Sequence, residues 1–380
     1  MTTKKILVLQ RVLPKYRLGV FKRLSNNTQY NYKLIIGSNV VDGKAFNSNK
    51  IEDIDYIKLQ GVSFNILGRR FYWQKRLLKT LVAEKPSLII CEAESHFLGY
   101  LVAILYKLFF NRKAKLVLWC YYALPGLSRS IFTPREIIKS FARMFFEGFI
   151  SYHSFGKNYL IRKGYQEEKI AVAYNVCNTD VHLRCAKKLA PLKHKLMNKY
   201  TISENLVVSF VGSLVTAKKP DIFLNIAKSC QNANVLFLVV GDGPELAKLE
   251  EQARRNSLDN VKFMGYLEDE VTEVISLSDV VVLPSRGGII ISEAMCYSTI
   301  PIVYQGDGIE LDLIVDGETG FLTKSDKPKD FASKILMLNS NRELLSRMKK
   351  NTLKKINNNF DTVHMSKAIS EFVNKILKGA

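Results

Sequence analysis

Short apolar runs alternate with amphipathic segments through the second half of the chain. The runs are five to nine residues long, rich in Val, Ile and Phe, and lie at 205–212, 233–241, 261–265, 278–285 and 299–304. Continuous β-branched runs separated by helical segments are typical of a parallel sheet that helices cover on both faces. The pattern therefore predicts a doubly wound α/β domain, which binds its ligand beyond the carboxyl ends of its strands.

The first half repeats this alternation less regularly. Strands are predicted at 4–10, 31–37, 54–59, 87–91, 115–119, 148–152 and 170–174. Helices are predicted near 18–25, 71–84, 95–110, 134–146 and 155–163, and at the end of the chain near 327–338, 341–357 and 362–378. Two Rossmann-like doubly wound domains that face each other across a cleft are the architecture we infer.

The predicted domain boundaries follow from these patterns. A first Rossmann-like domain is expected over residues 1–180 and a second over 205–360. Residues 181–204 have no clear strand and are expected to connect the two domains. The last segment, 361–380, is predicted as a helix that packs back toward the first domain.

Composition places the chain among globular, intracellular proteins. With 380 residues, 47% hydrophobic and 24% charged, it is too long for one ordinary core and shows no disordered stretch. Six cysteines without C-x-x-C spacing favour free thiols in a reducing cytosol over disulfides or a zinc site. The most apolar segment, 97–110, contains Lys107 and is shorter than the roughly 20 residues that cross a bilayer, so we expect a buried helix.

The excess of positive over negative charge is confined to the first half of the chain. Residues 1–200 hold 35 Lys and Arg against 12 Asp and Glu, whereas residues 201–380 hold 21 against 23. Such an excess indicates an anionic partner, namely phosphorylated substrates, an anionic membrane surface or nucleic acid, although a merely solvated basic surface is the alternative. No nucleic-acid-binding motif accompanies the scattered basic residues, so we expect no nucleic-acid partner and favour a membrane surface.

A glycine pair interrupts the apolar stretch LPSRGGIIISEAM, residues 283–295. A helix that begins near Gly288 and Ile289 would present unpaired amides and a positive dipole to a diphosphate, and Arg286 could add a bidentate contact. Glu293 stands alone in an otherwise apolar helix and could accept hydrogen bonds from the vicinal hydroxyls of a ribose. The alternative is a helix-start glycine pair followed by an exposed glutamate.

Two weaker signals lie at the ends of other strands. Gly212 ends the strand in FVGSLVTAKKPDIFL, and Lys218 of the following loop could place its ammonium on a phosphate. Glu92 follows the strand SLIIC and could contact an acceptor sugar. The five histidines have no ligand spacing, so we predict neither a metal site nor a cofactor.

The order of these motifs resembles the nucleotide-binding domain of retaining glycosyltransferases of family 4 (glycosyl transferases group 1), which have the GT-B fold. The resemblance covers about residues 205–325 and is carried, in order, by FVGSL…KK, VVGDGPEL, VKFMGYL, SDVVVLPS, GGIIISEAM, PIV and VDGETGFL. The first half is more faintly similar to the acceptor domain of that family at 14–24, 115–119 and 156–175.

The resemblance implies roles for particular residues of the second half. Glu293 would bind the nucleotide ribose, and the amides of Gly287, Gly288 and Ile289 would meet the diphosphate. Lys218 would neutralise that diphosphate as the sugar leaves.

Further roles are implied at the edges of the site. The backbone around Gly265 and Tyr266 would border the base. In the first half, the loop from Pro14 to Gly19 would close over the phosphates, with Tyr16 and Arg17 as candidates.

Three departures from the family pattern accompany the resemblance. Ser285 stands where the family usually has the first of two glutamates, Ser213 where an arginine is usual, and Tyr121 where a histidine is often found. Arg286 is our candidate to replace the missing charge of that arginine.

The activity that the resemblance implies is transfer of a sugar from a nucleoside diphosphate donor to a hydroxyl of a glycan or lipid-linked glycan, with retention at the anomeric carbon. Lys218, Arg286 and the helix start would meet the leaving charge, so neither metal nor cofactor is expected. We expect a role in bacterial surface polysaccharide assembly, such as lipopolysaccharide or capsule. The basic half would associate peripherally with the inner face of the cytoplasmic membrane and reach a polyprenyl-diphosphate-linked acceptor. Alternatives are a nucleotide-sugar 2-epimerase on the same fold and a catalytically inactive relative that binds lipid or nucleic acid.

Overall fold

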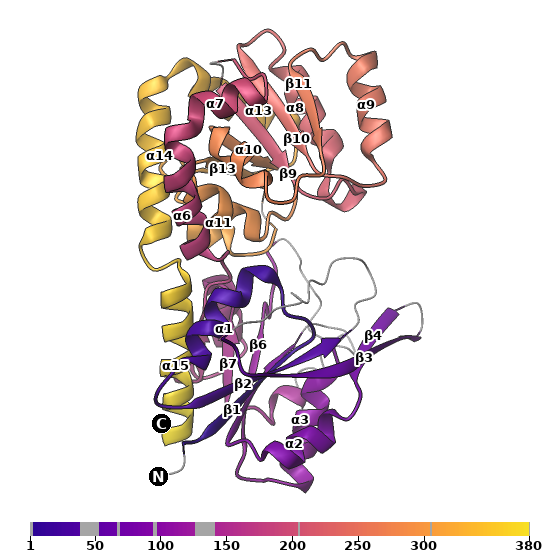
Figure 1. Cartoon of the computed structure of the whole chain (residues 1–380), viewed down its shortest axis with the longest axis vertical. Helices are drawn as coiled ribbons and strands as arrows, with labels where there is room; N and C mark the ends of the chain where they lie inside the picture. Colours follow the sequence, from indigo (N-terminus) through magenta and orange to yellow (C-terminus); the bar gives the residue numbers. More distant parts are fainter. Residues whose placement is uncertain are drawn as a thin grey trace. The chain divides into compact units, whose positions relative to one another are not determined.

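The computed structural model describes residues 3–38, 53–66, 69–93, 97–125, 141–203, 206–304 and 306–379. The chain divides into two units (Figure 1). Unit 1 comprises Met1–Ala123, Leu127–Asn178 and Thr362–Ala380, and unit 2 comprises Leu124–Gly126 and Thr179–Asp361. Each unit is an α/β structure built on a largely parallel sheet, which confirms the predicted fold class.

Unit 2 contains a six-stranded sheet in which all paired strands are parallel. Its strands are β9 (Leu206–Val211), β10 (Val235–Val240), β11 (Val261–Gly265), β12 (Val280–Leu283), β13 (Ile300–Tyr304) and β14 (Phe321–Thr323). They lie in the order β11-β10-β9-β12-β13-β14, so the direction of winding reverses between β9 and β12. Doubly wound sheets bind ligands beyond the carboxyl ends of the strands at such a reversal.

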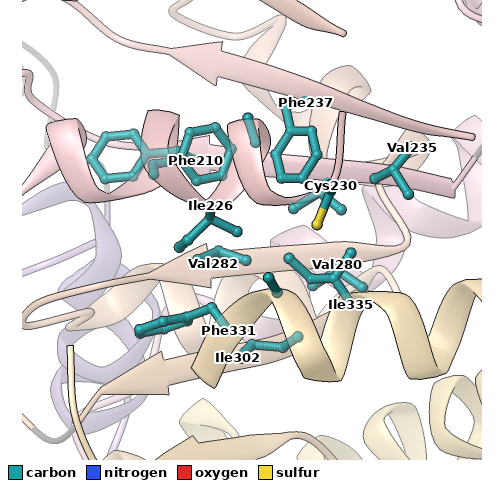
Figure 2. Close-up of a cluster of buried hydrophobic side chains, with 14 of the residues drawn as sticks. Phe210, Ile226, Cys230, Val235, Phe237, Val280, Val282, Ile302, Phe331 and Ile335 are labelled. Atoms are coloured by element: carbon teal, nitrogen blue, oxygen red, sulfur yellow. The ribbon is translucent and has the colours of Figure 1, made fainter. Parts of the chain in front are cut away.

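Helices cover both faces of this sheet. They are α6 (Thr179–Leu189), α7 (Lys193–Lys199), α8 (Pro220–Ser229), α9 (Leu246–Arg255), α10 (Val271–Leu277), α11 (Ile289–Cys296), α12 (Glu310–Leu313), α13 (Pro328–Ser340) and α14 (Arg342–Asn357). Figure 2 shows one core, in which Phe210 and Val282 of the strands meet Ile226 of α8 and Phe331 of α13. The continuous apolar runs of the strands are explained by this burial on both faces.

The segment that was expected to connect two domains, 181–204, is largely helical and belongs to unit 2. Helices α6 and α7 pack against α10, and α6 also packs against α11. Leu196 and Ile202 are buried in a second cluster together with strand residues such as Leu238. The amphipathic pattern of this segment therefore serves to cover one face of the unit 2 sheet.

Unit 1 is built on an eight-stranded sheet in the order β4-β3-β2-β1-β5-β6-β7-β8. Its strands are β1 (Lys5–Gln10), β2 (Asn31–Ser38), β3 (Tyr56–Ile66), β4 (Arg69–Gln74), β5 (Leu88–Glu92), β6 (Lys115–Cys120), β7 (Gly148–Ser151) and β8 (Ile170–Val172). All pairs are parallel except the hairpin of β3 and β4. The winding of this sheet reverses between β1 and β5.

The helix predicted at 71–84 is wrong in its first part. Residues up to Gln74 form β4, and the helix α2 spans only Leu77–Glu84. The rings of Phe64 and Phe71 stack across the hairpin with centroids 6.0 Å apart. Aromatic residues in RRFYWQ thus gain cross-strand partners that a helix would not offer them.

The other described helices of unit 1 are α1 (Leu18–Ser25), α3 (Gly99–Phe109), α5 (Ser154–Arg162) and α15 (Thr362–Lys378). α15 lies beside α1 (Figure 1) and buries an apolar stripe in the core of unit 1. The prediction of a helix at 134–146 falls mostly outside the described residues, of which 141–143 are helical.

Helix α3 was expected to be buried, and the structure corrects this prediction. Its inward face is buried, whereas Leu101, Leu105, Leu108 and Phe109 are exposed. No helix in the described ranges has the length and apolar character needed to cross a membrane.

Candidate functional site

The loops that follow β9 and β12 meet at the reversal of the unit 2 sheet. Lys218 ends a 3-10 helix, Thr216–Lys218, and its Nζ donates a hydrogen bond to the carbonyl oxygen of Arg286 at 2.6 Å. Arg286 itself is exposed, and Ser285, between it and β12, is buried. The two sequence signals, which are 68 residues apart, therefore lie together.

The turn between Arg286 and α11 requires both of its glycines. A Cβ on Gly287 would come within 2.7 Å of the Leu283 side chain and 2.9 Å of Ile291. Gly288 has φ +62° and ψ −138°, a conformation that L-residues rarely adopt. No described side chain caps the start of α11 at Ile289, so its first amides and its dipole are positioned to bind an anion.

Asp307, which sequence reasoning missed, lies at the same turn. Burial raises the pKa of its carboxyl, and nearby Lys218, Arg286 and a hydrogen bond from the Gly288 amide oppose that shift. The available signal was an acid between two glycines just after a strand, in YQGDGIE. Asp307 thus places a carboxylate beside the cations and the amide that could meet a diphosphate.

Glu310 holds this second loop in shape. Its buried carboxylate accepts hydrogen bonds from the amides of Gly306 at 2.8 Å, Asp307 at 3.2 Å and Gly308 at 2.8 Å. Burial raises the pKa of Glu310, while these backbone donors oppose the shift. The carboxylate is saturated by its own loop, so Glu310 is a structural residue that fixes the position of Asp307.

Glu293 lies half-buried in α11, and a second missed residue faces it. Burial raises the pKa of Glu293 to about 7. The Nε2 of His182 in α6 is 3.7 Å from the Glu293 Oε1, and the His182 Nδ1 is 3.3 Å from the hydroxyl of Tyr297. Burial lowers the pKa of His182, so the imidazole is neutral at physiological pH. No spacing rule could have joined His182 to Glu293, because the two residues are far apart in the sequence.

The remaining residues that were predicted to bind the nucleotide-sugar donor lie at the same edge of the sheet. The amide of Gly212 donates to the end of β10 at 3.0 Å, and the amide of Gly241 donates to the carbonyl of Gly265 at 2.8 Å. Ser213 is half-buried beside Gly212, and Tyr266 is exposed beside Gly265. The turns after β9, β10 and β11 are thus joined in a row that ends at Tyr266.

Arg17 of unit 1 is not an exposed loop residue. It ends a 3-10 helix, Lys15–Arg17, that runs directly into α1, and it is 3% exposed. Its Nη1 donates to Gln10 Oε1 at 2.6 Å and lies 3.5 Å from Glu92 Oε1, and its Nη2 donates to the hydroxyl of Tyr152 at 2.6 Å. The loop that was expected to cover the phosphates thus carries Arg17, whose guanidinium is buried among polar partners at the reversal between β1 and β5.

The other unit 1 candidates surround that cluster. Glu92 is buried, and its Oε2 also accepts a backbone amide of the loop after β1 at 2.8 Å. Tyr121 is half-buried, and its hydroxyl accepts from Asn175 Nδ2 at 3.5 Å. Gly19 lies in α1, where a Cβ would approach the Asn178 Oδ1 within 2.7 Å. Tyr16 lies half-buried, with its ring centroid 5.5 Å from the Arg17 guanidinium carbon.

Within the described ranges, no cluster of three or more His, Cys, Asp or Glu residues could hold a metal ion. The side chains of Lys218 and Arg286 bring positive charge to the glycine turn.

Comparisons with known proteins find similarity to glycosyltransferases. Residues 193–355 match the family model described as glycosyl transferases group 1. An uncharacterized glycosyltransferase of Methanocaldococcus jannaschii is 31% identical over 139 residues, which are 36% of this chain and 38% of that protein. An N-acetyl-alpha-D-glucosaminyl L-malate synthase of Bacillus anthracis is 27% identical over 156 residues, 40% of each chain. This chain thus spans less than half the length of these curated relatives.

The likeness in three dimensions extends over both units. The crystal structure of Anabaena HepE in complex with UDP superposes with a TM-score of 0.74 at 18% identity, covering 98% of this chain and 100% of that one. The fold is therefore of the GT-B type. Residues 193–355 are thus similar to the glycosyl transferases group 1, as the sequence motifs indicated.

Proposed function

We propose that this protein transfers a sugar from a nucleoside diphosphate donor to a hydroxyl of a glycan or lipid-linked glycan, with retention at the anomeric carbon. The observation that carries the proposal is the contact of Lys218 with the glycine turn before α11. It brings a cation and a helix start together where the unit 2 sheet reverses. The group 1 match over residues 193–355 and the likeness to a UDP complex support it.

Charge stabilisation is the main task of such a site. As the bond between the sugar and the diphosphate breaks, positive charge develops on the sugar ring and negative charge on the leaving diphosphate. Lys218, Arg286 and the first amides of α11, which lie together at the glycine turn, would stabilise that negative charge. The leaving phosphate would accept the proton of the attacking hydroxyl, so we nominate no side chain as general base.

Glu293 is our candidate for the ribose. A carboxylate with both oxygens available matches two vicinal hydroxyls, and a hydrogen bond to a charged acceptor contributes roughly 1.5–3 kcal/mol. The Nε2 of His182 in α6 lies 3.7 Å from one of these oxygens. The exposed Tyr266 beside Gly265 would border the base.

The acceptor side of the proposal rests on charge. Residues 1–200 carry 35 Lys and Arg against 12 Asp and Glu. A basic surface attracts anionic lipid and diphosphate groups. We therefore propose peripheral association with the cytoplasmic face of a membrane and a polyprenyl-diphosphate-linked acceptor in the assembly of a bacterial surface polysaccharide.

A thermal-shift panel with UDP, GDP, ADP, TDP and CMP tests the donor site. A ligand at a hundred times its dissociation constant stabilises the folded protein by about 2.7 kcal/mol. We expect one nucleotide to raise the melting temperature of the wild type, and Glu293→Ala to abolish that rise. Glu250→Ala changes an exposed glutamate of α9 and is the matched control. The absence of a shift with any nucleotide would overturn the proposal.

A further inference from the structure

Large apolar side chains are exposed on the outer face of α3 and just before β7. Leu101, Leu105, Leu108 and Phe109 of α3 are joined by Phe110, Phe141 and Met144, and we call these seven residues the apolar patch. The most exposed are Met144 at 77%, Phe109 at 75%, Phe141 at 62% and Phe110 at 56%. The spacing of the α3 members places them on one side of the helix.

The two parts of the apolar patch belong to one surface. The Nζ of Lys107 in α3 donates to the carbonyl oxygen of Phe145 at 3.3 Å and forms an ion pair with Glu147. The ring of Phe141 packs edge-on against Phe145, with centroids 5.5 Å apart. The end of α3 therefore lies against the segment that carries Phe141 and Met144.

The two segments that carry the apolar patch contain basic residues and no acidic ones. Residues 97–125 and 141–146 contain five basic residues and no Asp or Glu. Lys107 is paired with Glu147, but Arg112 and Lys113 are exposed and directly follow Phe110. On α5, which packs into the same core, Arg162 is exposed next to the partly exposed Ile161. Exposed cations therefore border the apolar side chains.

We propose that the apolar patch docks on an anionic lipid bilayer, with Phe109, Phe110 and Met144 inserted at the boundary of headgroups and acyl chains. Phe, Leu and Met flanked by Arg and Lys have the chemistry of an interfacial binding surface. A second copy of the chain would instead bring two sets of cations together without acids to pair them, which is unfavourable. Large apolar side chains exposed on neighbouring segments mark an interaction site.

This proposal rests on the membrane association in the proposed function and deepens it, because it assigns the docking surface. Charge alone would give binding through any basic part of unit 1. The apolar patch instead predicts that binding needs particular uncharged side chains. Donor binding in unit 2 is measured separately, so the failure of one proposal is distinguishable from the failure of the other.

Vesicle co-sedimentation of the full chain tests the proposal. The probes are vesicles of phosphatidylglycerol with phosphatidylethanolamine, and neutral phosphatidylcholine vesicles as a comparison. We expect the wild type to bind the anionic vesicles and the double variant Phe109→Gln/Met144→Gln to bind them at least about tenfold more weakly, because each substitution removes an inserted apolar side chain. The double variant Arg112→Gln/Lys113→Gln should bind anionic vesicles more weakly, and its binding should depend less on salt concentration than that of the wild type.

The matched control is Leu336→Gln/Met337→Gln, which removes two exposed apolar residues from α13 of unit 2. It should bind vesicles like the wild type. Thermal unfolding and the nucleotide-induced shift show that each variant is folded. Equal vesicle binding by wild type and Phe109→Gln/Met144→Gln would overturn the proposal, as would no binding of the wild type at low salt. A wild-type dimer that the double variant converts to monomer, with vesicle binding unchanged, would instead assign the apolar patch to a second copy.

Discussion

Asp307 places a negative charge among the groups that would bind a negatively charged donor. Its carboxylate receives a hydrogen bond from the Gly288 amide and faces Lys218 and Arg286. Without a donor, it compensates the two cations. With a donor bound, it would repel the diphosphate that takes over those contacts.

Asp307→Asn should therefore strengthen binding of the nucleoside diphosphate by roughly three- to tenfold, because repulsion disappears while an amide oxygen can still accept from Gly288. Binding of the matching nucleoside, which carries no phosphate, should not change. Isothermal titration calorimetry with both ligands measures this difference. Asp259→Asn, at an exposed position, is the control. Weaker diphosphate binding by Asp307→Asn would show that the carboxylate is itself a donor ligand.

Donor binding should also depend on pH through Glu293. Burial raises the pKa of this carboxyl to about 7, so it is largely protonated at pH 6 and largely ionised at pH 8. The ionised form is the stronger acceptor for ribose hydroxyls, so binding releases a proton and tightens as pH rises through 7. Burial shifts the pKa of the neighbouring His182 in the opposite direction, below its ordinary value.

The measurement is the dissociation constant of the intact nucleotide sugar at pH 6, 7 and 8, because its diphosphate does not titrate there. We expect about three- to tenfold tighter binding at pH 8 than at pH 6. Glu293→Gln should bind weakly and with no pH dependence over this interval. A pH dependence that survives in Glu293→Gln would assign the titration to another group.

Single residues mark the limit of what the sequence could predict about the site. Lys218 and the glycine turn were predicted, because a helix start after an apolar strand is a local pattern. Asp307 and His182 were not, because their partners lie on other strands and helices. Arg17 was predicted as a candidate in a loop that closes over the phosphates. Its partners Gln10, Glu92 and Tyr152 could not be predicted, because only the folded unit 1 brings them together.

At the scale of elements, strands that are buried on both faces were the easiest to predict. The apolar runs of unit 2 match β9 to β13 closely, since a parallel sheet between helix layers needs continuously apolar strands. The hairpin of β3 and β4 was missed, because RRFYWQ becomes a strand only by pairing with the end of β3. Segment 181–204 was predicted to be an interdomain connection because it has no clear strand, although its helices cover one face of the unit 2 sheet.

For helix α3, the apolar pattern predicted more burial than the structure has. Its sequence is apolar nearly all round, which usually indicates a buried helix. The fold offers burial to only one side of it. The hydrophobic pattern predicts which side chains avoid water. It does not predict whether those side chains pack against protein or against lipid.

At the scale of the whole molecule, unit 1 is assembled from both ends of the chain. Its core contains β1 from the start of the sequence and Ile369, Phe372 and Val373 of α15 from the end. α15 packs tightly on β7, since a Cβ on Gly148 would come within 2.7 Å of the Phe372 ring. The last helix is therefore part of the unit 1 core, while the donor residues belong to unit 2.

Phe372→Ala should accordingly destabilise unit 1 by about 3–5 kcal/mol, the usual cost of removing a buried aromatic side chain. It should leave the nucleotide-induced shift of unit 2 intact, because Phe372 belongs to the core of unit 1 and the residues predicted to bind the nucleotide belong to unit 2. Urea unfolding followed by the fluorescence of Trp73 and Trp119, which both belong to unit 1, measures the first effect, and nucleotide titration measures the second. Glu371→Ala, an exposed neighbour whose ion pair with Lys367 is at the surface, should change the free energy of unfolding by less than about 0.5 kcal/mol. Equal stability of Phe372→Ala and wild type would contradict the assignment of α15 to the unit 1 core. Loss of nucleotide binding in a folded Phe372→Ala variant would instead show that the two units do not act separately.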